Sequence, residues 1–352
     1  MMKAVIKAIA TANPPKKFTQ ERIYQFLSSR FDLKSEEKQL YEKILLDGPI
    51  KTRHFGLDND EQILLQDPDH LITRFLKHGR LTAAQAARKA LTRAKLDPKD
   101  VGGIIVNTCT GYLCPGLSSY LVEDLRLDGS VKVVDIAGMG CGAAIPNLEC
   151  AAKMAPLDNR VVLSIAVEIC SATFFMEPQP DLVVSNCLFA DGASAAVVAQ
   201  TKNNNSEKIV TLLDFESLIL PKERENLRYR SVQGRLRNVL SKRVPVAAAR
   251  SVKEVTNKVL ERNGLAPDEI AFWAVHPGGS LVLERIQKEL DLPDGALDYS
   301  YQILRNYGNM SSPSVMFVLE RILQEARPKR NQKCLLLSFG AGFTAFAALA
   351  EF

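Results

Sequence analysis

The chain lacks any long, uninterrupted hydrophobic run. Its longest early apolar stretch, residues 4–12, is short, is broken by Lys7 and is followed by Pro14 and Pro15. A signal peptide needs an unbroken apolar region, and a helix that spans a membrane needs about 20 apolar residues. We therefore expect neither feature, and we expect a cytoplasmic protein without membrane insertion.

The chain also lacks pairs of cysteines at short spacing, and it has no large excess of positive or negative charge. The seven cysteines are an odd number scattered through apolar segments, at positions 109, 114, 141, 150, 170, 187 and 334. This pattern favours neither a disulfide framework nor a zinc site, so we predict reduced thiols and no metal. The formal net charge of +5 gives little support for nucleic acid as a partner.

The remaining composition is that of an ordinary globular protein. The 352 residues are 46% hydrophobic and 24% charged, which is typical of a folded enzyme-sized chain. This length is enough for about two domains' worth of core.

One cysteine has a setting that the other six do not share. Cys141 lies in the glycine-rich segment 138–144, directly after the apolar run 131–137, which predicts a turn from a strand into a helix. The amides and dipole at a helix N-terminus lower the pKa of a thiol and can bind an oxyanion. A nucleophile is therefore one interpretation of Cys141, and a small buried hydrophobic residue is the alternative.

Two further polar residues occupy similar turns. His276 ends an apolar segment and precedes two glycines and the helix-like residues 281–290, while Asn309 precedes the helix-like residues 314–323. Side chains in such turns are open to a substrate. The alternatives are a buried structural histidine and an asparagine that caps a helix, although capping alone would not require Gly308.

These turns carry a family resemblance. The sequence resembles the type III polyketide synthases, the chalcone synthase-like branch of the thiolase superfamily, over nearly its whole length. The most specific segments are His-Pro-Gly-Gly at 276–279 and Gly-Asn-Met-Ser-Ser at 308–312, supported by 10–15, 188–193 and 338–344. Initiating ketoacyl synthases share the order Cys, His, Asn but usually carry different residues after the histidine. Thiolases use a second cysteine in the last glycine turn, which 338–344 lacks.

The fold class is predicted to be α/β. Residues 81–94 are helix-like and 101–107 form a short apolar strand, and such alternation implies a sheet covered on both faces. The segments 160–166 and 193–199 are echoed by 333–339 and 344–350, which indicates a duplication. The resemblance implies a thiolase-like five-layered αβαβα fold from two duplicated halves. We expect the halves to be residues 1–205, with Cys141, and 206–352, with His276 and Asn309.

The resemblance also implies a reaction. Cys141, as a thiolate paired with protonated His276, would accept an acyl group from an acyl-CoA. Malonyl-CoA would then lose its carboxylate, and His276 and Asn309 would stabilise the resulting enolate. Attack on the Cys141 thioester extends the chain by a Claisen condensation, and repetition followed by cyclisation gives a polyketide. The only cofactor-like molecule is CoA, as part of the substrates; an oxyanion hole would use the Cys141 N–H and the turn at 339–342.

Further site residues carry over from the family. Phe189 matches an aromatic gatekeeper, Asn238 falls near the place of a second gatekeeper, and Lys51 and Arg53 match the segment that binds CoA phosphates. The implied homodimer would bring the loop with Cys114 toward the partner subunit. The substrate-pocket residues that the resemblance implies are Cys109, Thr110, Cys114, Cys170, Thr173, Phe189 and Ser311. Core packing and a solvated charged turn are the alternatives.

A basic stretch between Pro221 and Pro245 contains eight Lys or Arg residues against two Glu. A solvated surface or entrance loop is one interpretation. Attraction of anionic CoA substrates is the other.

Competing functions remain at this level. An initiating ketoacyl synthase would make one condensation with malonyl carried by acyl carrier protein, and a non-catalytic acyl-binding homologue would need no nucleophile. A hydroxymethylglutaryl-CoA synthase fits the segments around His276 and Asn309 poorly. Among polyketide products, a resorcinol or pyrone from a fatty acyl starter and a naphthalene from malonyl alone are both open.

Overall fold

The computed structural model of the protein describes residues 3–155, 160–201 and 209–352. Within these residues, nine strands form one sheet in the order β11-β12-β13-β8-β1-β7-β6-β4-β5. Their bounds are β1 (Lys3–Ala12), β4 (Val101–Thr108), β5 (Lys132–Ala137), β6 (Val161–Ile169), β7 (Asp191–Thr201), β8 (Val210–Ile219), β11 (Ile270–Val275), β12 (Lys333–Gly340) and β13 (Thr344–Glu351). Two short antiparallel pairs are β2 (Lys16–Thr19) with β3 (Thr52–Phe55), and β9 (Leu227–Val232) with β10 (Arg235–Leu240).

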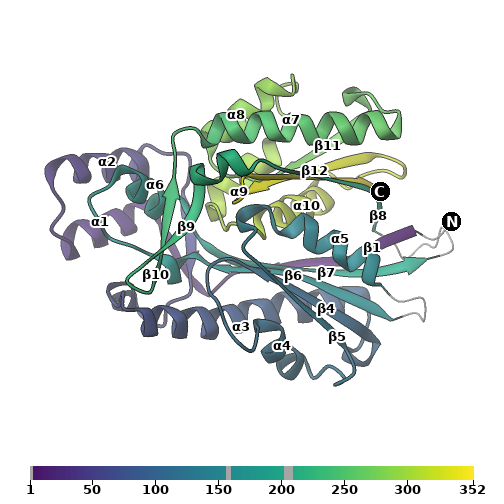
Figure 1. Cartoon of the computed structure of the whole chain (residues 1–352), viewed down its shortest axis with the longest axis horizontal. Helices are drawn as coiled ribbons and strands as arrows, with labels where there is room; N and C mark the ends of the chain where they lie inside the picture. The colour runs from purple at the N-terminus through teal and green to yellow at the C-terminus, as the bar shows by residue number, and fades with distance from the viewer. Residues whose placement is uncertain (1–2, 156–159, 202–208) are drawn as a thin grey trace.

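Helices cover this sheet in three layers. Figure 1 shows α7 and α8 at the top, α5 and α10 in the middle, and α3 and α4 at the bottom, with strands between them. The α-helices are α1 (Gln20–Arg30), α2 (Ser35–Leu46), α3 (Pro68–Ala94), α4 (Leu117–Leu125), α5 (Ala144–Met154), α6 (Pro180–Leu188), α7 (Val244–Asn263), α8 (Ser280–Glu289), α9 (Asp298–Tyr307) and α10 (Ser314–Glu325). This is the five-layered αβαβα arrangement that was expected.

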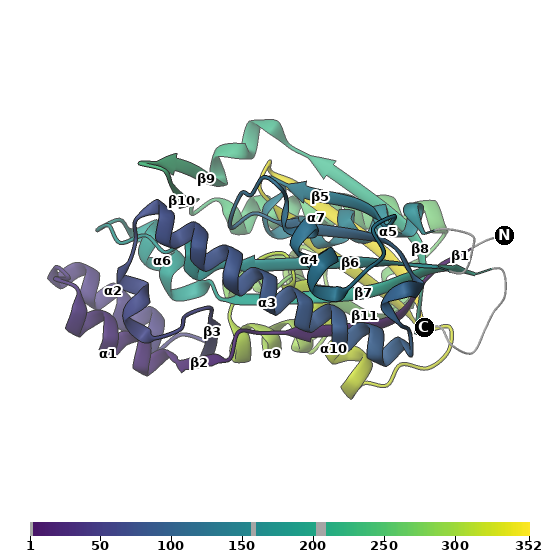
Figure 2. The same cartoon turned by 90° about the horizontal axis from the view of Figure 1, so that it is seen from below.

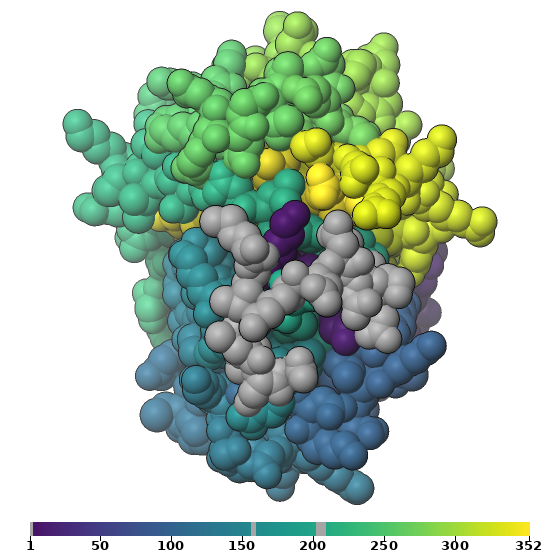
Figure 3. Space-filling view, turned by 90° about the vertical axis from the view of Figure 1, so that its right-hand side faces the viewer, coloured from purple at the N-terminus to yellow at the C-terminus, as the bar shows by residue number. Residues whose placement is uncertain are grey.

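The sheet is continuous because its two parts meet at β1 and β8. These two strands pair over a short stretch, from Ala4 opposite Leu212 to Ile6 opposite Val210. The central helices contact both parts: α5 packs on β4 and β6 and also on β12 and β13, and α10 packs on β1 and β7 and also on β11 and β12. The two halves therefore share one helical layer. In Figure 3 the blue region of the first half lies below the green and yellow region of the second.

Burial explains why the strands are apolar throughout. All nine residues of β6 are buried, because a strand with helices on both faces has no solvent-facing side. Alanines dominate the buried face of α3, including Ala83, Ala87 and Ala90, and these small side chains let the helix pack closely on β1, β7 and β6.

The predicted echo between the halves is visible as two strand pairs. Residue 160 directly precedes β6, and 161–166 and 193–199 lie in β6 and β7, which pair antiparallel. Residues 333–339 and 344–350 lie in β12 and β13, which also pair antiparallel. The proposed boundary between residues 205 and 206 lies outside the described residues and stays a prediction. The helix expected at 81–94 begins earlier, at Pro68, because the Asp67 side chain accepts from His70 N and caps it.

A separate group of elements, which we call the cap, lies at one end of the layers. The cap consists of α1, α2, α6 and the β9–β10 hairpin, on the left of Figure 1 and again on the left of Figure 2. Leu27, Tyr41, Leu45, Val183 and Cys187 form its own small core. No helix in the described part of the chain is both long and apolar enough to cross a membrane.

Candidate active site

Cys141 lies in a 3-10 turn, Gly140–Gly142, between β5 and α5, as the sequence predicted. The glycine turn after β12 packs directly against it: a Cβ on Gly340 would lie 2.5 Å from Gly142 N and 3.1 Å from Cys141 N. Gly140 has φ +60, and a Cβ there would lie 2.9 Å from Ala341 N. The two turns approach so closely that only glycine fits at both positions.

His276 follows β11, and its N–H donates to Leu337 O at 2.8 Å, which fixes it beside β12. The side chain is fully buried, and its ring meets the Phe339 ring edge-on with the centroids 5.2 Å apart. Neither ring nitrogen has a hydrogen-bond partner among the described residues. The imidazole is therefore held by packing, and both of its nitrogens are buried without a hydrogen-bond partner in the described part of the chain.

Asn309 lies in the turn between α9 and α10. Its Nδ2 donates to Gly278 O at 3.2 Å, and its Oδ1 accepts from Ser311 N at 2.8 Å. Gly308 has φ +72, and a Cβ on it would lie 2.9 Å from the Arg53 side chain. Asn309 is not the N-cap of α10, because that helix begins at Ser314 and Pro313 occupies the cap position.

A chain of contacts joins the three predicted catalytic residues. Ser311 Oγ donates to Cys141 Sγ at 3.2 Å, and the Asn309 side chain binds both Ser311 N and Gly278 O. Gly278 in turn donates to His276 O at 2.9 Å. The structure thus brings together residues that are up to 168 positions apart in the sequence, from Cys141 to Asn309.

Burial controls the charge of both titratable groups. It raises the pKa of the Cys141 thiol to about 12, although the hydrogen bond from Ser311 lowers that pKa in part. It lowers the pKa of His276 to about 3. Both groups are therefore neutral at pH 7, which differs from the thiolate and imidazolium pair expected from the sequence, because desolvation penalises each charged form.

Glu168 is a buried acidic residue that sequence reasoning missed. Its Oε2 accepts from Thr108 Oγ1, Cys109 N, Thr110 N and Thr110 Oγ1, and its Oε1 accepts from Ser312 Oγ. Burial raises the pKa of this carboxyl, while these hydrogen bonds lower it. The available signal was an acidic residue near the end of an otherwise apolar strand.

Several predicted pocket residues lie beside Cys141. Cys170 and Phe189 form a small buried cluster with it, and Cys109 Sγ lies 3.7 Å from Ser311 Oγ. Thr110 is buried and bound to Glu168 rather than open to a pocket. Cys114 is exposed and is not part of the site within this chain.

Thr173 links the site to the cap. Its hydroxyl donates to Cys170 O at 2.9 Å and lies 3.3 Å from Tyr229 Oη of β9. Tyr229 belongs to the basic stretch between Pro221 and Pro245. Nothing in that stretch indicated that this tyrosine would contact Thr173.

Arg53 does not fit its predicted role in binding CoA phosphates. Its side chain is 1% exposed, its Nε donates to Gln20 Oε1, and its Nη1 donates to the backbone oxygens of Asn186 and Phe189 at 2.7 Å. Arg53 therefore fixes the segment that carries Phe189. Lys51 is exposed, so its proposed contact with CoA remains a prediction.

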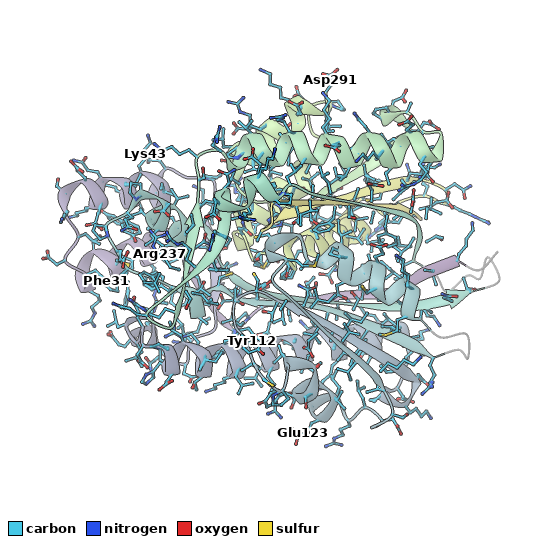
Figure 4. All side chains as sticks on the ribbon, in the orientation of Figure 1. Phe31, Lys43, Tyr112, Glu123, Arg237 and Asp291 are labelled. Carbon is cyan, nitrogen blue, oxygen red and sulfur yellow. The ribbon has the colours of Figure 1, made fainter. Side chains whose placement is uncertain are left out.

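The basic stretch forms a hairpin rather than an irregular loop. Arg237 of β10 pairs with Asp181 and Glu177 and donates to Gln179, at the start of α6, and Figure 4 shows it between these elements. Arg228 pairs with Glu225. Part of the positive charge is thus neutralised within the protein, which leaves less for the attraction of anionic substrates.

Two family models match the chain. One, described as FAE1/Type III polyketide synthase-like protein, matches residues 11–263, and the other, described as the C-terminal domain of chalcone and stilbene synthases, matches residues 215–350. The chain belongs to the type III polyketide synthases. This synthase is accordingly an acyltransferase-type enzyme, and the family that its motifs indicated is confirmed.

Characterised relatives of this synthase come from several bacteria. It is 30% identical to the 1,3,6,8-tetrahydroxynaphthalene synthase of Streptomyces peucetius subsp. caesius, with 97% of this chain and 91% of the relative covered. It is 29% identical to the 3,5-dihydroxyphenylacetyl-CoA synthase of Streptomyces toyocaensis, with 88% and 81% covered. An alpha-pyrone synthesis polyketide synthase-like protein of Mycobacterium tuberculosis is 27% identical, with 99% and 91% covered.

Solved structures confirm the thiolase-like fold of this synthase. The polyketide synthase PKS-I of the brown alga Ectocarpus siliculosus superposes with a TM-score of 0.91 at 27% identity, over 100% of this chain and 98% of that one. A type III pentaketide synthase from Neurospora crassa gives a TM-score of 0.87 at 23% identity, over 99% of each chain. Within residues 3–155, 160–201 and 209–352, no group of three His, Cys, Asp or Glu side chains could hold a metal ion.

Proposed function

We propose that this synthase transfers an acyl group from an acyl-CoA to Cys141 and extends it with malonyl-CoA by repeated decarboxylative Claisen condensation, followed by cyclisation. The observation that supports this proposal is the chain of contacts from Cys141 through Ser311 and Asn309 to the loop that follows His276. These contacts link the turns that carry Cys141, Asn309 and His276, which supports their joint action as nucleophile, amide donor and base.

Acylation begins from the neutral pair. His276, whose pKa is lowered to about 3, is unprotonated at pH 7 and can accept the proton of the Cys141 thiol as the sulfur attacks the thioester carbon. The tetrahedral oxyanion would be bound by the Cys141 N–H and by an N–H of the turn at 339–342, which packs on it. CoA then leaves as a thiol when the proton returns to its sulfur.

Extension uses a different pair of donors, Asn309 and His276, on a second substrate. Asn309 Nδ2 donates one of its two hydrogens to Gly278 O, and the other can be donated to the malonyl thioester oxygen. With a donor from His276, it would stabilise the enolate that forms when carbon dioxide leaves. The enolate carbon attacks the carbonyl carbon of the Cys141 thioester, the C–S bond breaks, and Cys141 leaves as a thiolate that takes a proton from solvent. These steps involve no net electron transfer, so they use no redox cofactor, and the N–H donors stabilise the oxyanions that a metal would otherwise bind.

We also propose that the synthase is a cytoplasmic homodimer that pairs through the edge at β5. This strand ends the sheet, and Val133 and Val134 on it are exposed. Tyr112, in the loop that carries Cys114, is 78% exposed and is labelled in Figure 4. An exposed apolar edge of this kind is a typical contact surface. A monomer in analytical ultracentrifugation at micromolar concentration would contradict this part of the proposal.

Purified protein is incubated with labelled malonyl-CoA, with and without a panel of acyl-CoA starters, and the products are measured by mass spectrometry. We expect multiply extended, cyclised products that disappear in Cys141→Ala and persist in Cys150→Ala, which changes an exposed cysteine on α5. Single extension only with carrier-bound malonyl would instead indicate an initiating ketoacyl synthase. Absence of any turnover would favour an acyl-binding protein.

The two half-reactions can be separated. Cys141→Ala keeps His276 and Asn309 and should still convert malonyl-CoA to acetyl-CoA and carbon dioxide, whereas His276→Gln and Asn309→Leu should lose this decarboxylation. Equal decarboxylation by all three variants would remove His276 and Asn309 from the proposed mechanism.

A further inference from the structure

The turn that carries Cys141 lacks a hydrogen bond that a helix would normally make. In an α-helix each backbone oxygen accepts from the N–H four residues later, so Gly142 O would be bound by residue 146. That residue is Pro146, which has no backbone N–H. The next bond in the series is present, because Asn147 N donates to Ala143 O at 3.0 Å. Proline therefore leaves the oxygen of the residue after Cys141 without its helical donor.

A side chain from a distant strand supplies a donor to this oxygen. Ser338 Oγ of β12 donates to Gly142 O at 3.0 Å, across 196 positions of sequence. The Ser338 side chain is fully buried, and a buried hydroxyl costs free energy unless it is hydrogen-bonded. A buried carbonyl without a donor carries a similar cost. The hydroxyl of Ser338 and the oxygen that Pro146 cannot bind therefore satisfy each other.

The neighbours of Ser338 on β12 hold other parts of the candidate site. Leu337 O accepts from His276 N at 2.8 Å. A Cβ on Gly340 would lie 3.1 Å from Cys141 N, so the end of the strand packs on the nucleophile turn. The strand that fixes His276 is therefore also tied to the turn of Cys141, through the hydroxyl of Ser338.

This hydrogen bond acts on a point of the turn that is weakly restricted by its own backbone. Gly142 has no Cβ, so its conformation is less limited than that of other residues, and the peptide that follows it carries the oxygen that Ser338 binds. Rotation of this peptide would move the backbone around Cys141. A displacement of about 1 Å in a reacting group can lower a rate on the order of 100-fold. A hydroxyl at this position can thus control reactivity from behind the nucleophile.

We propose that Ser338 is a positioning residue: its hydroxyl replaces the hydrogen bond that Pro146 cannot donate, and it thereby holds Cys141 in the orientation for attack. The inference rests on the proposed function, in which the Cys141 thiol is the nucleophile and the Cys141 N–H binds the oxyanion. In this role Ser338 acts through the backbone of Gly142 and makes no contact with the substrate.

The first test separates acyl transfer from decarboxylation. With malonyl-CoA and an acyl-CoA starter that supports turnover, Ser338→Ala should lower kcat by roughly tenfold or more, with a smaller change in KM. In the Cys141→Ala background, the same substitution should leave decarboxylation of malonyl-CoA within about twofold, because that step uses His276 and Asn309. A general loss of structure would lower both activities. An unchanged kcat, or an equal fall of both activities, would overturn the proposal.

Ser251→Ala is the matched control. Ser251 is also a buried serine whose hydroxyl donates to backbone oxygens, those of Ala247 and Ala248 in α7. Its loss should lower the urea midpoint of unfolding about as much as Ser338→Ala does, since each change removes a buried hydroxyl that is hydrogen-bonded. It should leave kcat unchanged. A similar fall of kcat in Ser251→Ala would show that lost stability explains the effect, and would overturn the role of Ser338.

A second substitution should restore the missing donor. Pro146→Ala supplies an N–H at the position from which an α-helix binds Gly142 O. In the Pro146→Ala background, Ser338→Ala should lower kcat by less than about threefold, because the backbone now donates to the same oxygen. A loss as large as in the wild-type background would overturn the exchange of donors.

Ser338→Cys extends the test if Ser338→Ala does not fold, as judged by circular dichroism. A thiol is a weaker donor than a hydroxyl, so Ser338→Cys should also lower kcat, and Pro146→Ala should again reduce the loss. Wild-type kcat in a folded Ser338→Cys, or a loss that Pro146→Ala does not reduce, would overturn the proposal.

The two proposals fail in different ways. Suppose that the wild type forms no product, but Ser338→Ala lowers the urea midpoint less in the Pro146→Ala background than in the wild-type background. The proposed function is then wrong, and the exchange of donors at Gly142 stands. If products form but Ser338→Ala leaves kcat unchanged, the positioning role is wrong and the function stands.

Discussion

The layered core and the cap hold their functional residues by different means. In the core, the turns of Cys141, His276 and Asn309 are fixed by backbone contacts and by glycines that leave no room for a side chain. In the cap, α1 buries only Gln20 and Leu27 of its 11 residues, and its inner face borders an open cavity. Single substitutions can therefore change the cavity without moving the reacting atoms.

This difference indicates how one fold can serve several products. The relatives named above are a naphthalene synthase, a dihydroxyphenylacetyl-CoA synthase and an alpha-pyrone synthesis protein, and all three match most of this chain. On the function proposed above, close backbone packing would maintain a common reaction, and side chains around the cavity would differ between enzymes with different substrates. Substitutions in the core should thus reduce activity, while substitutions in the cap should alter the choice of substrate or the stability of the fold.

The largest effect is expected from the contact between the two glycine turns. Gly340→Ala places a Cβ 2.5 Å from Gly142 N and 3.1 Å from Cys141 N, so the nucleophile must shift. A shift of about 1 Å costs on the order of 100-fold in rate, which steady-state product formation would measure. Gly129→Ala is the control, because its Cβ would have no neighbour within 4 Å. Full activity in Gly340→Ala would show that the core is less rigid than the packing indicates.

The next effect concerns the neutral state of His276. The pKa of His276 is lowered from 6.5 in the unfolded chain to about 3 in the fold. The contribution of the neutral imidazole to the unfolding free energy is therefore fully present above pH 6.5 and is lost as the pH falls toward 3. His276→Gln lacks this titration. Between pH 7 and pH 4.5 the wild type should lose about 2 kcal/mol more unfolding free energy than the variant, as measured by urea unfolding. Parallel losses in the two proteins would mean that His276 is not held neutral by burial.

A smaller effect is expected from the hydrogen bond between Ser311 and Cys141. Its hydroxyl lowers the pKa of Cys141 against the larger effect of burial, so Ser311→Ala should raise that pKa further and leave less thiolate at pH 8. We expect alkylation of Cys141 by iodoacetamide to slow severalfold, since the thiolate is the reactive form. Ser119→Ala, at an exposed position of α4, provides the control. Alkylation as fast as in the wild type would exclude this role.

The smallest effect is expected in the cap. Arg237→Ala removes the ion pairs of β10 with Glu177 and Asp181 and should lower the unfolding free energy by about 1 kcal/mol, because the side chain is mostly buried. Arg228→Ala removes a pair in which both side chains are more exposed, and should cost about half of that or less. Neither change should alter the alkylation rate of Cys141. A changed alkylation rate would show that the cap and the core are coupled, and would contradict the view that they hold their residues independently.

Much of the site could be predicted because its signals are local. A glycine turn after an apolar strand predicted the position of Cys141 between β5 and α5, and similar turns predicted His276 and Asn309. The motifs around His276 and Asn309 also predicted the family, and the family models confirm it.

Other features could not be predicted because they depend on residues far apart in the sequence. Arg53 lies two residues after Lys51 in the basic segment, yet its guanidinium is buried against Gln20, Asn186 and Phe189. Glu168 collects its donors from the loop after β4 and from Ser312. Burial of this kind is set by which elements pack together, and it also favours the neutral forms of Cys141 and His276 over the charged forms that were expected.

The sequence by itself determined the candidate catalytic residues, the turns that present them and the apolar strands behind those turns, because backbone conformation and hydrophobic pattern are properties of neighbouring residues. Only the tertiary structure decided that the pair is neutral, that Arg53 is structural, and that the cap and core enclose a cavity. These properties arise from desolvation and from distances between separate elements, and neither exists until the chain has folded.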